Sequence, residues 1–293
     1  MARATAGALA GRRLTPVGCE AERVPSRRAL LQAVAASAPA LAQPGTDSTT
    51  TNADAPASPL SVGTVVHRVP SIPDRTFRRV VRAVDRGVEQ VARNADRELD
   101  RGVEYDVAAG GTAPRGTVVT NTRDAVWKST ADWLESEDRR DPDALHLMLV
   151  DAPLQQSIGY GGNRTHLTNG GPVSYANVGA TEQWDDAAVT DNMAVHEVLH
   201  GLVTPFDARP VIGRGCEHDL GAVIPAGDGR GALVTPLATA YAETTVGGET
   251  QWPGSGCLGH FSQDVGYDPD WWGHTYALSP ATLAATARYL GRI

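Results

Sequence analysis

The sequence predicts one α+β domain with a mixed sheet, a helix that carries the chemistry and a loop-rich C-terminal half. Three patterns indicate this class: apolar residues at helical spacing, one short apolar run typical of a buried strand, and a C-terminal region rich in Gly and Pro. Of the 293 residues, 41% are hydrophobic, which is enough for a core. No run of 18 apolar residues occurs, so no membrane-spanning helix is predicted.

The elements of the domain follow from periodicity and capping residues. In chain order, the predicted elements are a helix over 75–98, a strand over 104–109, a helix from 122 to about 137, a strand over 145–150, a strand over 173–178, a helix over 187–203 and a final helix over 280–290. Asp74 and Ser279 stand at expected helix caps, and Pro280 suits a first helical position. Asn121 or Thr122 can cap the second helix. Most of the chain between the last two helices is expected to be irregular.

The first 65 residues are assigned to export and to a tether. Segment 1–42 contains the twin-arginine pattern Ser26-Arg27-Arg28-Ala29-Leu30-Leu31, followed by a mildly apolar stretch that ends in Ala40-Leu41-Ala42. This order is typical of an export signal, although a short amphipathic helix with a chance arginine pair is the alternative. Residues 43–65 are rich in Ser, Thr, Pro and Ala and are expected to be a disordered linker. The sequence thus predicts a secreted protein, exported by the twin-arginine route, whose domain spans 66–293.

The chain is acidic, and its basic residues are almost all arginine. It has 26 Lys and Arg against 34 Asp and Glu, and Lys128 is the one lysine. After residue 42, 20 basic residues stand against 32 acidic ones, a net charge of −12. This balance argues against a nucleic-acid partner. Acidic, lysine-poor surfaces stay hydrated in strong salt, so the composition favours a halophilic protein, with a GC-rich genome as the alternative.

The predicted export decides which cysteines remain in the mature protein and whether they can form a disulfide bond. Cys19 lies in the segment that export would remove, which leaves Cys216 and Cys257. An even pair in an oxidising compartment predicts a disulfide bond between them. Two thiolate zinc ligands are the alternative, but the sequence lacks close Cys-x-x-Cys spacing.

The chemistry is concentrated in the motif His-Glu-Val-Leu-His at 196–200. His196 and His200 are four residues apart, so on a helix they lie one above the other and can bind the same zinc ion. Glu197 projects about 80° round the helix from their midpoint, so it can reach an attacking water without binding the metal. The apolar residues on the opposite side can anchor the helix in the core: Val195, Val198, Leu199 and Leu202. A helix with two surface histidines is the alternative interpretation.

A hydrolytic zinc site needs a third protein ligand and one open position. The compact solution is a ligand six residues after His200, but that position is Phe206. We expect His218 to complete the site, because imidazole is a preferred zinc donor and the neighbouring Cys216 can pin its loop. The alternatives are Asp207, Glu217, His260 and His274.

Three segments together resemble the metzincin-type zinc peptidases, and more closely their uncharacterised secreted haloarchaeal relatives. They are the HExxH helix, Glu-His-Asp-Leu-Gly at 217–221, and Val-Thr-Pro-Leu-Ala-Thr-Ala-Tyr at 234–241. The resemblance implies a zincin/metzincin-like fold over roughly residues 75 to 245. Leu237 stands where the family has the methionine of a turn beneath the metal, and Val203 replaces a family glycine. By this resemblance Tyr241 approaches the metal or the oxyanion; a tyrosine packed near the site is the alternative.

The sequence therefore predicts a secreted zinc metallopeptidase, a hydrolase that acts on peptides or proteins. His196, His200 and His218 would bind Zn²⁺, and Glu197 would be the general base. The strand over 173–178, if it is an edge, could pair with an extended substrate. A non-peptide zinc hydrolase and a catalytically inactive secreted zinc-binding protein remain the alternatives. Asn163-Arg164-Thr165 is a glycosylation sequon on an expected loop.

Overall fold

The computed structural model describes residues 58–153, 157–184, 187–238, 243–244, 250–251, 262–263 and 265–293. No helix within these ranges is both long enough and apolar enough to cross a membrane. The predicted export signal and most of the predicted linker lie outside the described residues, so both stay predictions.

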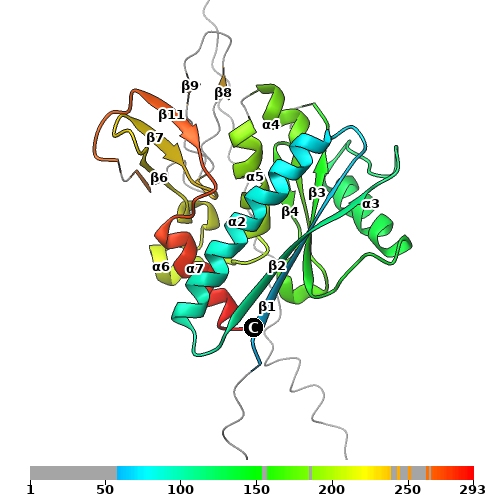
Figure 1. Ribbon diagram of the computed structural model, residues 1–293, viewed down its shortest axis with the longest axis horizontal. Coiled ribbons are helices and arrows are strands. Elements are labelled where there is room, and N and C mark those ends of the chain that lie inside the picture. The colour runs from blue at the N-terminus through cyan, green and yellow to red at the C-terminus, as the bar shows by residue number, and fades with distance from the viewer. Residues whose placement is uncertain are drawn as a thin grey trace, which may run out of the picture. The chain divides into compact units, whose positions relative to one another are not determined.

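A five-stranded mixed sheet organises the first half of the domain (Figure 1). In spatial order its strands are β2 (Val103–Thr112), β1 (Leu60–Arg68), β3 (Ala144–Val150), β5 (Val173–Asn177) and β4 (Gly161–Asn163). The first four strands are parallel, whereas β4 runs antiparallel to β5. Every residue of β3 is buried, which confirms the central strand expected from its apolar run.

Two expectations for this sheet need correction. β1 begins at Leu60, inside the segment 43–65 assigned to the linker, because Val62, Thr64 and Val66 alternate onto the buried face. β5 is not the edge strand, since β4 pairs along it. The Gly-rich loop folds back as a strand here because Gly162 lacks a side chain: a Cβ would lie 2.9 Å from the Trp127 ring and 3.0 Å from the Tyr175 ring.

Two helices cover one face of the sheet and a third covers the other (Figure 1). α2 (Asp74–Glu98) and α5 (Ala187–Leu199) share the larger core, and α3 (Arg123–Ser136) packs on the opposite face. Thr122 caps α3, and its hydroxyl accepts a hydrogen bond from the Ala125 N–H at 3.1 Å. The predicted helices over 75–98 and 122–137 are therefore confirmed, but the N-cap of α2 is Pro73 and the expected cap Asp74 is the first residue of the helix.

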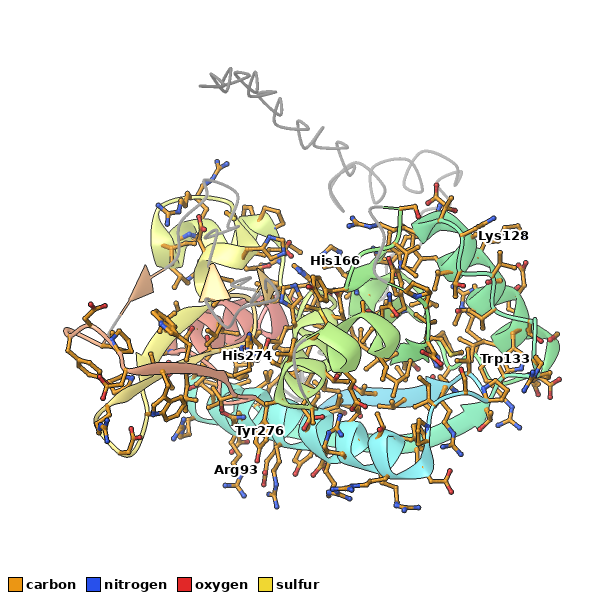
Figure 2. All side chains as sticks on the ribbon, turned by 90° about the horizontal axis from the view of Figure 1, so that it is seen from above. Arg93, Lys128, Trp133, His166, His274 and Tyr276 are labelled. Atoms are coloured by element: carbon orange, nitrogen blue, oxygen red, sulfur yellow. The ribbon has the colours of Figure 1, made fainter. Side chains whose placement is uncertain are left out.

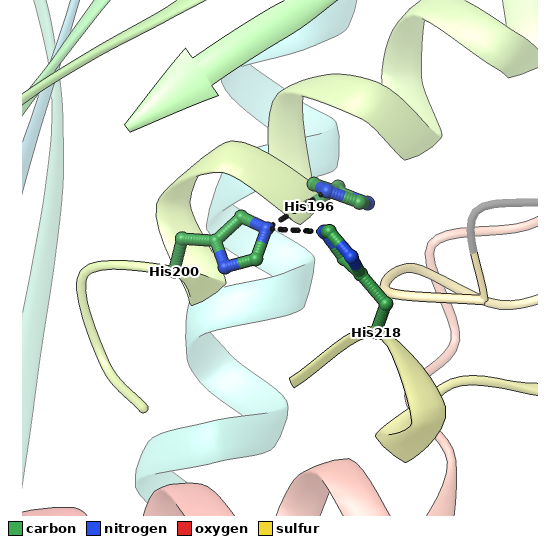
Figure 3. Close-up of side chains that lie close together, drawn as sticks. All are labelled: His196, His200 and His218. Carbon is green, nitrogen blue, oxygen red and sulfur yellow. Dashed lines mark hydrogen bonds between the residues drawn. The ribbon is translucent and has the colours of Figure 1, made fainter. Parts of the chain in front are cut away.

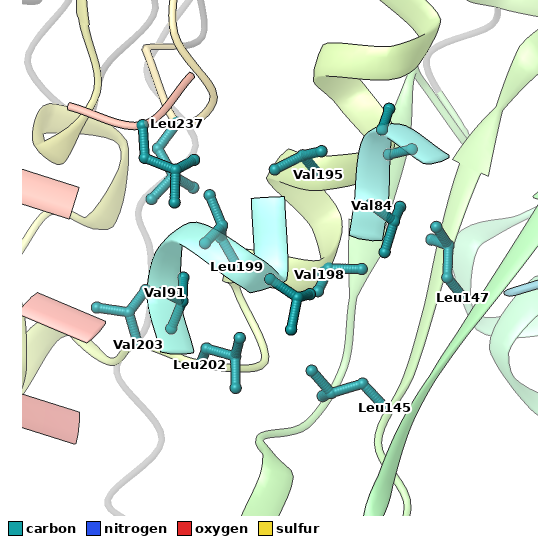
Figure 4. Packing of buried hydrophobic residues seen from close by; sticks show 14 of the residues in the cluster. Val84, Val91, Leu145, Leu147, Val195, Val198, Leu199, Leu202, Val203 and Leu237 are labelled. Carbon is teal, nitrogen blue, oxygen red and sulfur yellow. The ribbon is translucent and has the colours of Figure 1, made fainter. Parts of the chain in front are cut away.

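The apolar side of α5 packs into the larger core against α2 and β3. The side chains of this cluster labelled in Figure 4 are Val84, Val91, Leu145, Leu147, Val195, Val198, Leu199, Leu202, Val203 and Leu237. α2 and α5 approach closely at Gly87, where a Cβ would lie 2.7 Å from Val195 Cγ1. Full burial of one such side chain contributes about 1.5–3 kcal/mol, so this face holds the histidine-bearing side of α5 in place.

The C-terminal half is more regular than expected. It contains a four-stranded sheet with the order β10 (Ser262–Gln263), β6 (Ala222–Pro225), β7 (Gly231–Val234) and β11 (Trp271–His274), and a separate pair of β8 (Glu243–Thr244) with β9 (Thr250–Gln251). Its strands have two to four residues, too few for a clear alternating pattern. The Trp271 ring packs over Gly231, where a Cβ would be 2.0 Å from the ring. The expectation of a mostly irregular half is therefore wrong for these strands.

Short helices complete the domain. They are α4 (Val178–Trp184), the 3₁₀ helices η1 (Leu167–Asn169) and η2 (Glu217–Leu220), α6 (Pro205–Ile212) and α7 (Pro280–Leu290). Ser279 caps α7 by accepting a hydrogen bond from the Thr282 N–H at 3.0 Å, which confirms the predicted final helix. The Ser279 hydroxyl also donates to the Leu220 carbonyl, so α7 holds the end of η2.

Candidate metal centre

The two histidines of the motif lie at the C-terminal end of α5. Its last residue is Leu199, and His200 continues the helical path because its N–H donates to the His196 carbonyl at 3.2 Å. The spacing of four residues therefore still brings the two rings together, with their Nε2 atoms 3.0 Å apart. His196 is 3% exposed.

His218 reaches the same point from η2 (Figure 3). Its Nε2 lies 3.0 Å from Nε2 of His200. Two buried neighbours fix η2: Asp219 pairs with Arg214, and Leu220 joins the larger core. The three imidazoles of His196, His200 and His218 each offer a ligand atom within 4.8 Å of the others, so they could hold a metal ion.

This donor set fits a small cation that prefers nitrogen. At the usual Zn–N length, two nitrogens on a tetrahedral ion are about 3.3 Å apart, close to the separations seen here. Burial lowers the pKa of His218 to about 3, and it lowers the pKa of His196 well below its usual value. His200 adds to both effects as a neighbouring positive charge. These two rings are therefore neutral near pH 7, which is the state that binds a metal.

Glu217 fixes the orientation of His200. Its Oε2 lies 2.5 Å from Nδ1 of His200, so the Nδ1–H can donate to the carboxylate and the Nε2 lone pair is directed at the other two rings. Burial would lower the pKa of His200, but the hydrogen bond and charge of Glu217, with the charge of Glu197, raise it instead. Glu217 thus contacts a histidine of the cluster rather than joining it as a ligand.

Glu197 lies beside the histidines in a sheltered position. It is 4% exposed, and burial raises its pKa to about 7, against the opposing charges of His200 and Arg123. Its Oε2 is buried with no hydrogen-bond partner among the described residues. Gly161 of β4 makes room for this carboxylate, because a Cβ there would lie 2.4 Å from its Oε1. A carboxyl group with such a pKa can both accept and release a proton near neutral pH.

An open cleft of about 520 Å³ contains the histidines and Glu197. Its wall includes Arg123, Trp127, Tyr160, Arg164 and His166. None of these five residues belongs to a catalytic or metal-binding motif, and sequence reasoning did not select them for the site. The structure gathers them because β4 folds back along β5 and places 159–166 opposite α3.

The sequon residue Asn163 also belongs to this cleft wall. Its Nδ2 donates to Ser174 Oγ at 2.7 Å, so the amide that would carry a glycan is already used inside the fold. The expected loop is therefore corrected, because Asn163 is the last residue of β4, and glycosylation of the sequon stays a prediction.

The alternative ligands lie elsewhere. Asp207 is 1% exposed, and its carboxylate pairs with the Arg292 guanidinium through bonds of 2.8 and 2.6 Å while it also caps α6 through Thr204. Phe206 is 68% exposed. His274 belongs to β11 of the second sheet, and His260 lies outside the described residues. Among the described residues, the three-histidine cluster is the group placed to hold a metal.

Of the remaining predicted residues, Leu237 and Cys216 are among the described residues, whereas Tyr241 and Cys257 are not. Leu237 is fully buried in the larger core at a left-handed turn with φ of 69° (Figure 4). Tyr241 lies outside the described residues, so its approach to the metal stays a prediction. Cys216 is buried beside η2, and its expected partner Cys257 is also outside the described residues, so the disulfide stays a prediction too.

Comparisons with known proteins add little to this geometry. No family model and no curated protein matches the chain. Among solved structures, metalloproteinase-II from Bacteroides fragilis aligns with a TM-score of 0.37 and 12% identity over 50% of this chain and 43% of that one. A chaperone–substrate complex aligns with a TM-score of 0.37 and 11% identity over 79% of this chain and 35% of that one. The chain spans less than half of either structure, and likenesses this weak carry no functional argument.

Proposed function

We propose that this protein is a secreted zinc-dependent peptidase. The observation that supports it is the convergence of three imidazole nitrogens beside a buried glutamate in an open cleft. Three protein ligands with space beside them are typical of catalytic zinc sites, whereas structural sites are closed by a fourth ligand. The cleft leaves that space for a substrate.

In this proposal His196, His200 and His218 hold the zinc ion, and Glu217 orients His200. Bound zinc would supply Lewis acidity toward the substrate carbonyl and the attacking water. Glu197 takes the proton of that water and delivers it to the leaving amine. Its raised pKa of about 7 suits both steps, and Gly161 leaves room for the carboxylate to turn between them.

β4 supplies the means of holding a peptide. Tyr160 O accepts from Asn177 N–H, and Arg164 N–H donates to Val173 O, so the even-numbered residues of this segment bond to β5. In an antiparallel pair the residues between them direct their N–H and C=O groups outward. Gly161 and Asn163 therefore present free edge positions in the cleft wall, where an extended substrate can add as a further strand.

Export by the twin-arginine route, adaptation to strong salt and a Cys216–Cys257 disulfide belong to the same proposal. Their support is the sequence: the ordered parts of segment 1–42, the net charge of −12 after residue 42 and the even pair of cysteines.

Replacing Glu197 by Gln tests the proposed function. The histidines are untouched, so Glu197→Gln should retain bound zinc, but it should lose hydrolysis of an unstructured protein such as casein. Glu98→Gln is a matched control, because Glu98 is an exposed residue at the end of α2. Zinc content is measured by metal analysis and hydrolysis by release of peptides. Full activity in Glu197→Gln would remove Glu197 from the mechanism, and a zinc-loaded wild-type protein that cleaves no peptide would contradict the proposed peptidase.

A further inference from the structure

The wall of the cleft opposite the histidines carries two arginines and a tryptophan between them. Arg123 and Trp127 are four residues apart on α3, so they lie on one face of that helix, and both line the cleft. The Trp127 indole N–H donates to the Gly162 carbonyl at 3.3 Å, which fixes the ring against β4. Arg123 is close enough to Glu197 for its charge to oppose the rise in the pKa of that residue.

Arg164 directly follows β4 and completes this wall. Its guanidinium carbon lies 5.8 Å from the centre of the Trp127 ring, so the ring orients the cation. Its ion-pair partner among the described residues is Asp124, at a long 3.8 Å, and the two side chains are 56% and 85% exposed. A pair this long and this exposed neutralises the cation weakly, so Arg164 can exchange Asp124 for a ligand.

The charge of the cleft differs from that of the chain. The whole chain has a formal net charge of −8, yet the described acidic residues that line the cleft are Glu197 and Glu217. Glu217 is already bonded to His200. No carboxylate in the described part of the chain forms an ion pair with Arg123. The wall therefore presents two arginines toward a substrate in an otherwise acidic protein.

We propose that Arg123 and Arg164 select substrates that carry a carboxylate near the scissile bond. This inference rests on the proposed peptidase and names its substrate class. Arg123 lies beside Gly159, before β4, where a Cβ would be 3.3 Å from its guanidinium, and Arg164 lies beyond the other end of β4. β4 lies between these two positions and Glu197 lies beside its first residue, Gly161, so a peptide paired with β4 can meet one arginine toward each end of the strand. The carboxylate can come from an acidic side chain or from the C-terminus of the peptide.

A set of matched peptides tests this inference. Three peptides with acetylated and amidated ends carry Glu, Gln or Lys on both sides of one cleavage position, and a fourth Gln peptide has a free C-terminus. The zinc-loaded protein should cleave the Glu peptide with a kcat/KM about tenfold above the Gln peptide, and the Lys peptide should be slowest. The preference should shrink in about 1 M salt, because screening weakens an exposed charge pair. A preference that appears only for the free C-terminus would identify that carboxylate as the one recognised.

Variants of the two arginines assign the preference to the cleft wall. Arg164→Gln and Arg123→Gln should each reduce the ratio of kcat/KM for the Glu peptide to kcat/KM for the Gln peptide several-fold, whatever their rate on the Gln peptide alone. Arg93→Gln is the matched control, because Arg93 points outward from α2, on the far side from His166 of the cleft (Figure 2). Equal rates for the blocked Glu and Gln peptides and no gain from a free C-terminus would overturn the inference.

Binding to the Glu197→Gln variant separates this inference from the proposed function. Calorimetry should show tighter binding of the carboxylate peptide than of the neutral one, and Arg164→Gln should remove the difference. If wild-type protein cleaves no peptide but this binding preference is present, the peptidase proposal fails and carboxylate recognition stands. If cleavage occurs without any carboxylate preference in rate or binding, the peptidase stands and the selection by Arg123 and Arg164 is wrong.

Discussion

The described residues include two clusters of histidines that look alike by distance and differ in what they can do. In the cleft, His196, His200 and His218 bring ring nitrogens 3.0 Å apart. Beneath α3, His67 of β1 and His146 of β3 bring ring nitrogens 3.2 Å apart, and they are 1% and 0% exposed. One cluster opens onto a cleft of about 520 Å³, whereas the other is sealed between the sheet and Trp133.

In the sealed pair, each ring nitrogen of His67 and His146 already has a hydrogen-bond partner. The Gly111 N–H donates to Nδ1 of His67, so the neutral ring carries its proton on Nε2 and donates it to Nδ1 of His146. Nε2 of His146 lies 3.1 Å from both the N–H and the carbonyl oxygen of Asp141, so it has a backbone partner in either protonation state. Each ring has one donor and one acceptor, and both are used. This pair therefore has no lone pair left for a metal.

The cleft cluster is arranged differently, because the Nε2 atoms converge on one point. The Glu217 carboxylate accepts a hydrogen bond from Nδ1–H of His200, which leaves the Nε2 lone pair facing the other two imidazoles. A cation at that point would satisfy all three nitrogens together. The comparison teaches that the direction of the lone pairs, rather than the closeness of imidazoles, distinguishes a metal site from a packed core.

The largest expected effect is on metal affinity when a converging histidine is removed. His218→Ala leaves two ligands, so zinc affinity should fall by about a hundredfold or more and activity should be lost. His67→Ala should keep the affinity and lose stability instead, because it leaves the Gly111 N–H and His146 unpaired. Asp207→Ala should also keep the affinity. Competition titrations with a zinc indicator and urea unfolding measure the two properties. Loss of zinc in Asp207→Ala with retention in His218→Ala would reverse the ligand assignment.

A substitution at one glycine beside each cluster should also distinguish a catalytic role from a structural one. A Cβ at Gly161 would lie 2.4 Å from Oε1 of Glu197, and a Cβ at Gly110 would lie 2.3 Å from Nδ1 of His67. Such overpacking costs about 1–3 kcal/mol. Gly161→Ala should therefore reduce kcat more than tenfold with zinc still bound, whereas Gly110→Ala should lower the free energy of unfolding with kcat unchanged. The same effect of both substitutions on kcat would show that the two sites are not independent.

Acid should lower the free energy of unfolding, because the buried ring of His67 resists protonation in the folded protein. Burial, followed by the nearby His146 and Arg139, lowers the pKa of His67 to about 3, while an unfolded histidine titrates near 6.5. Between these values the unfolded chain binds more protons, so this stability is fully present above about pH 6.5 and is lost as the pH falls toward 3. At pH 5 the loss from His67 is about 2 kcal/mol.

Urea unfolding at pH 7 and pH 5 in the presence of a chelator measures this loss. His67→Gln should lose less stability than the wild type over the same range, because it removes the titrating group. Identical losses in the two proteins would contradict the assignment of acid sensitivity to the sealed pair.

Local patterns account for the parts of the fold that the sequence predicted. α2 and β3 each carry their full signal within one segment: apolar residues at helical spacing in the first, an unbroken apolar run in the second. β4 and the strands of the second sheet are two to four residues long, and β4 depends on Trp127 and Tyr175 packing over Gly162. Such contacts join distant segments, so no local pattern reveals them.

The candidate site divides in the same way. His196, Glu197 and His200 follow from one helical motif, and the choice of His218 followed from ligand chemistry and a nearby cysteine. The structure brings all three histidines together, and their role as zinc ligands stays a prediction. Arg123 and Arg164 could not be identified, because they meet only after β4 has folded along β5.

The smallest expected effect concerns the group that orients one ring in each cluster. In the cleft this group is the Glu217 carboxylate, and in the sealed pair it is the backbone of Asp141, which no substitution removes. Glu217→Ala should weaken zinc affinity about tenfold, because His200 then loses the partner that directs its Nε2 toward the other rings. Glu217→Gln should weaken it less, since the amide oxygen still accepts the Nδ1–H. The same zinc competition titration measures both, with Glu98→Gln as the control. Equal losses in the Ala and Gln variants would mean that the negative charge of Glu217, rather than its hydrogen bond, supports the site, and no loss in either would show that convergence of the three rings is sufficient by itself.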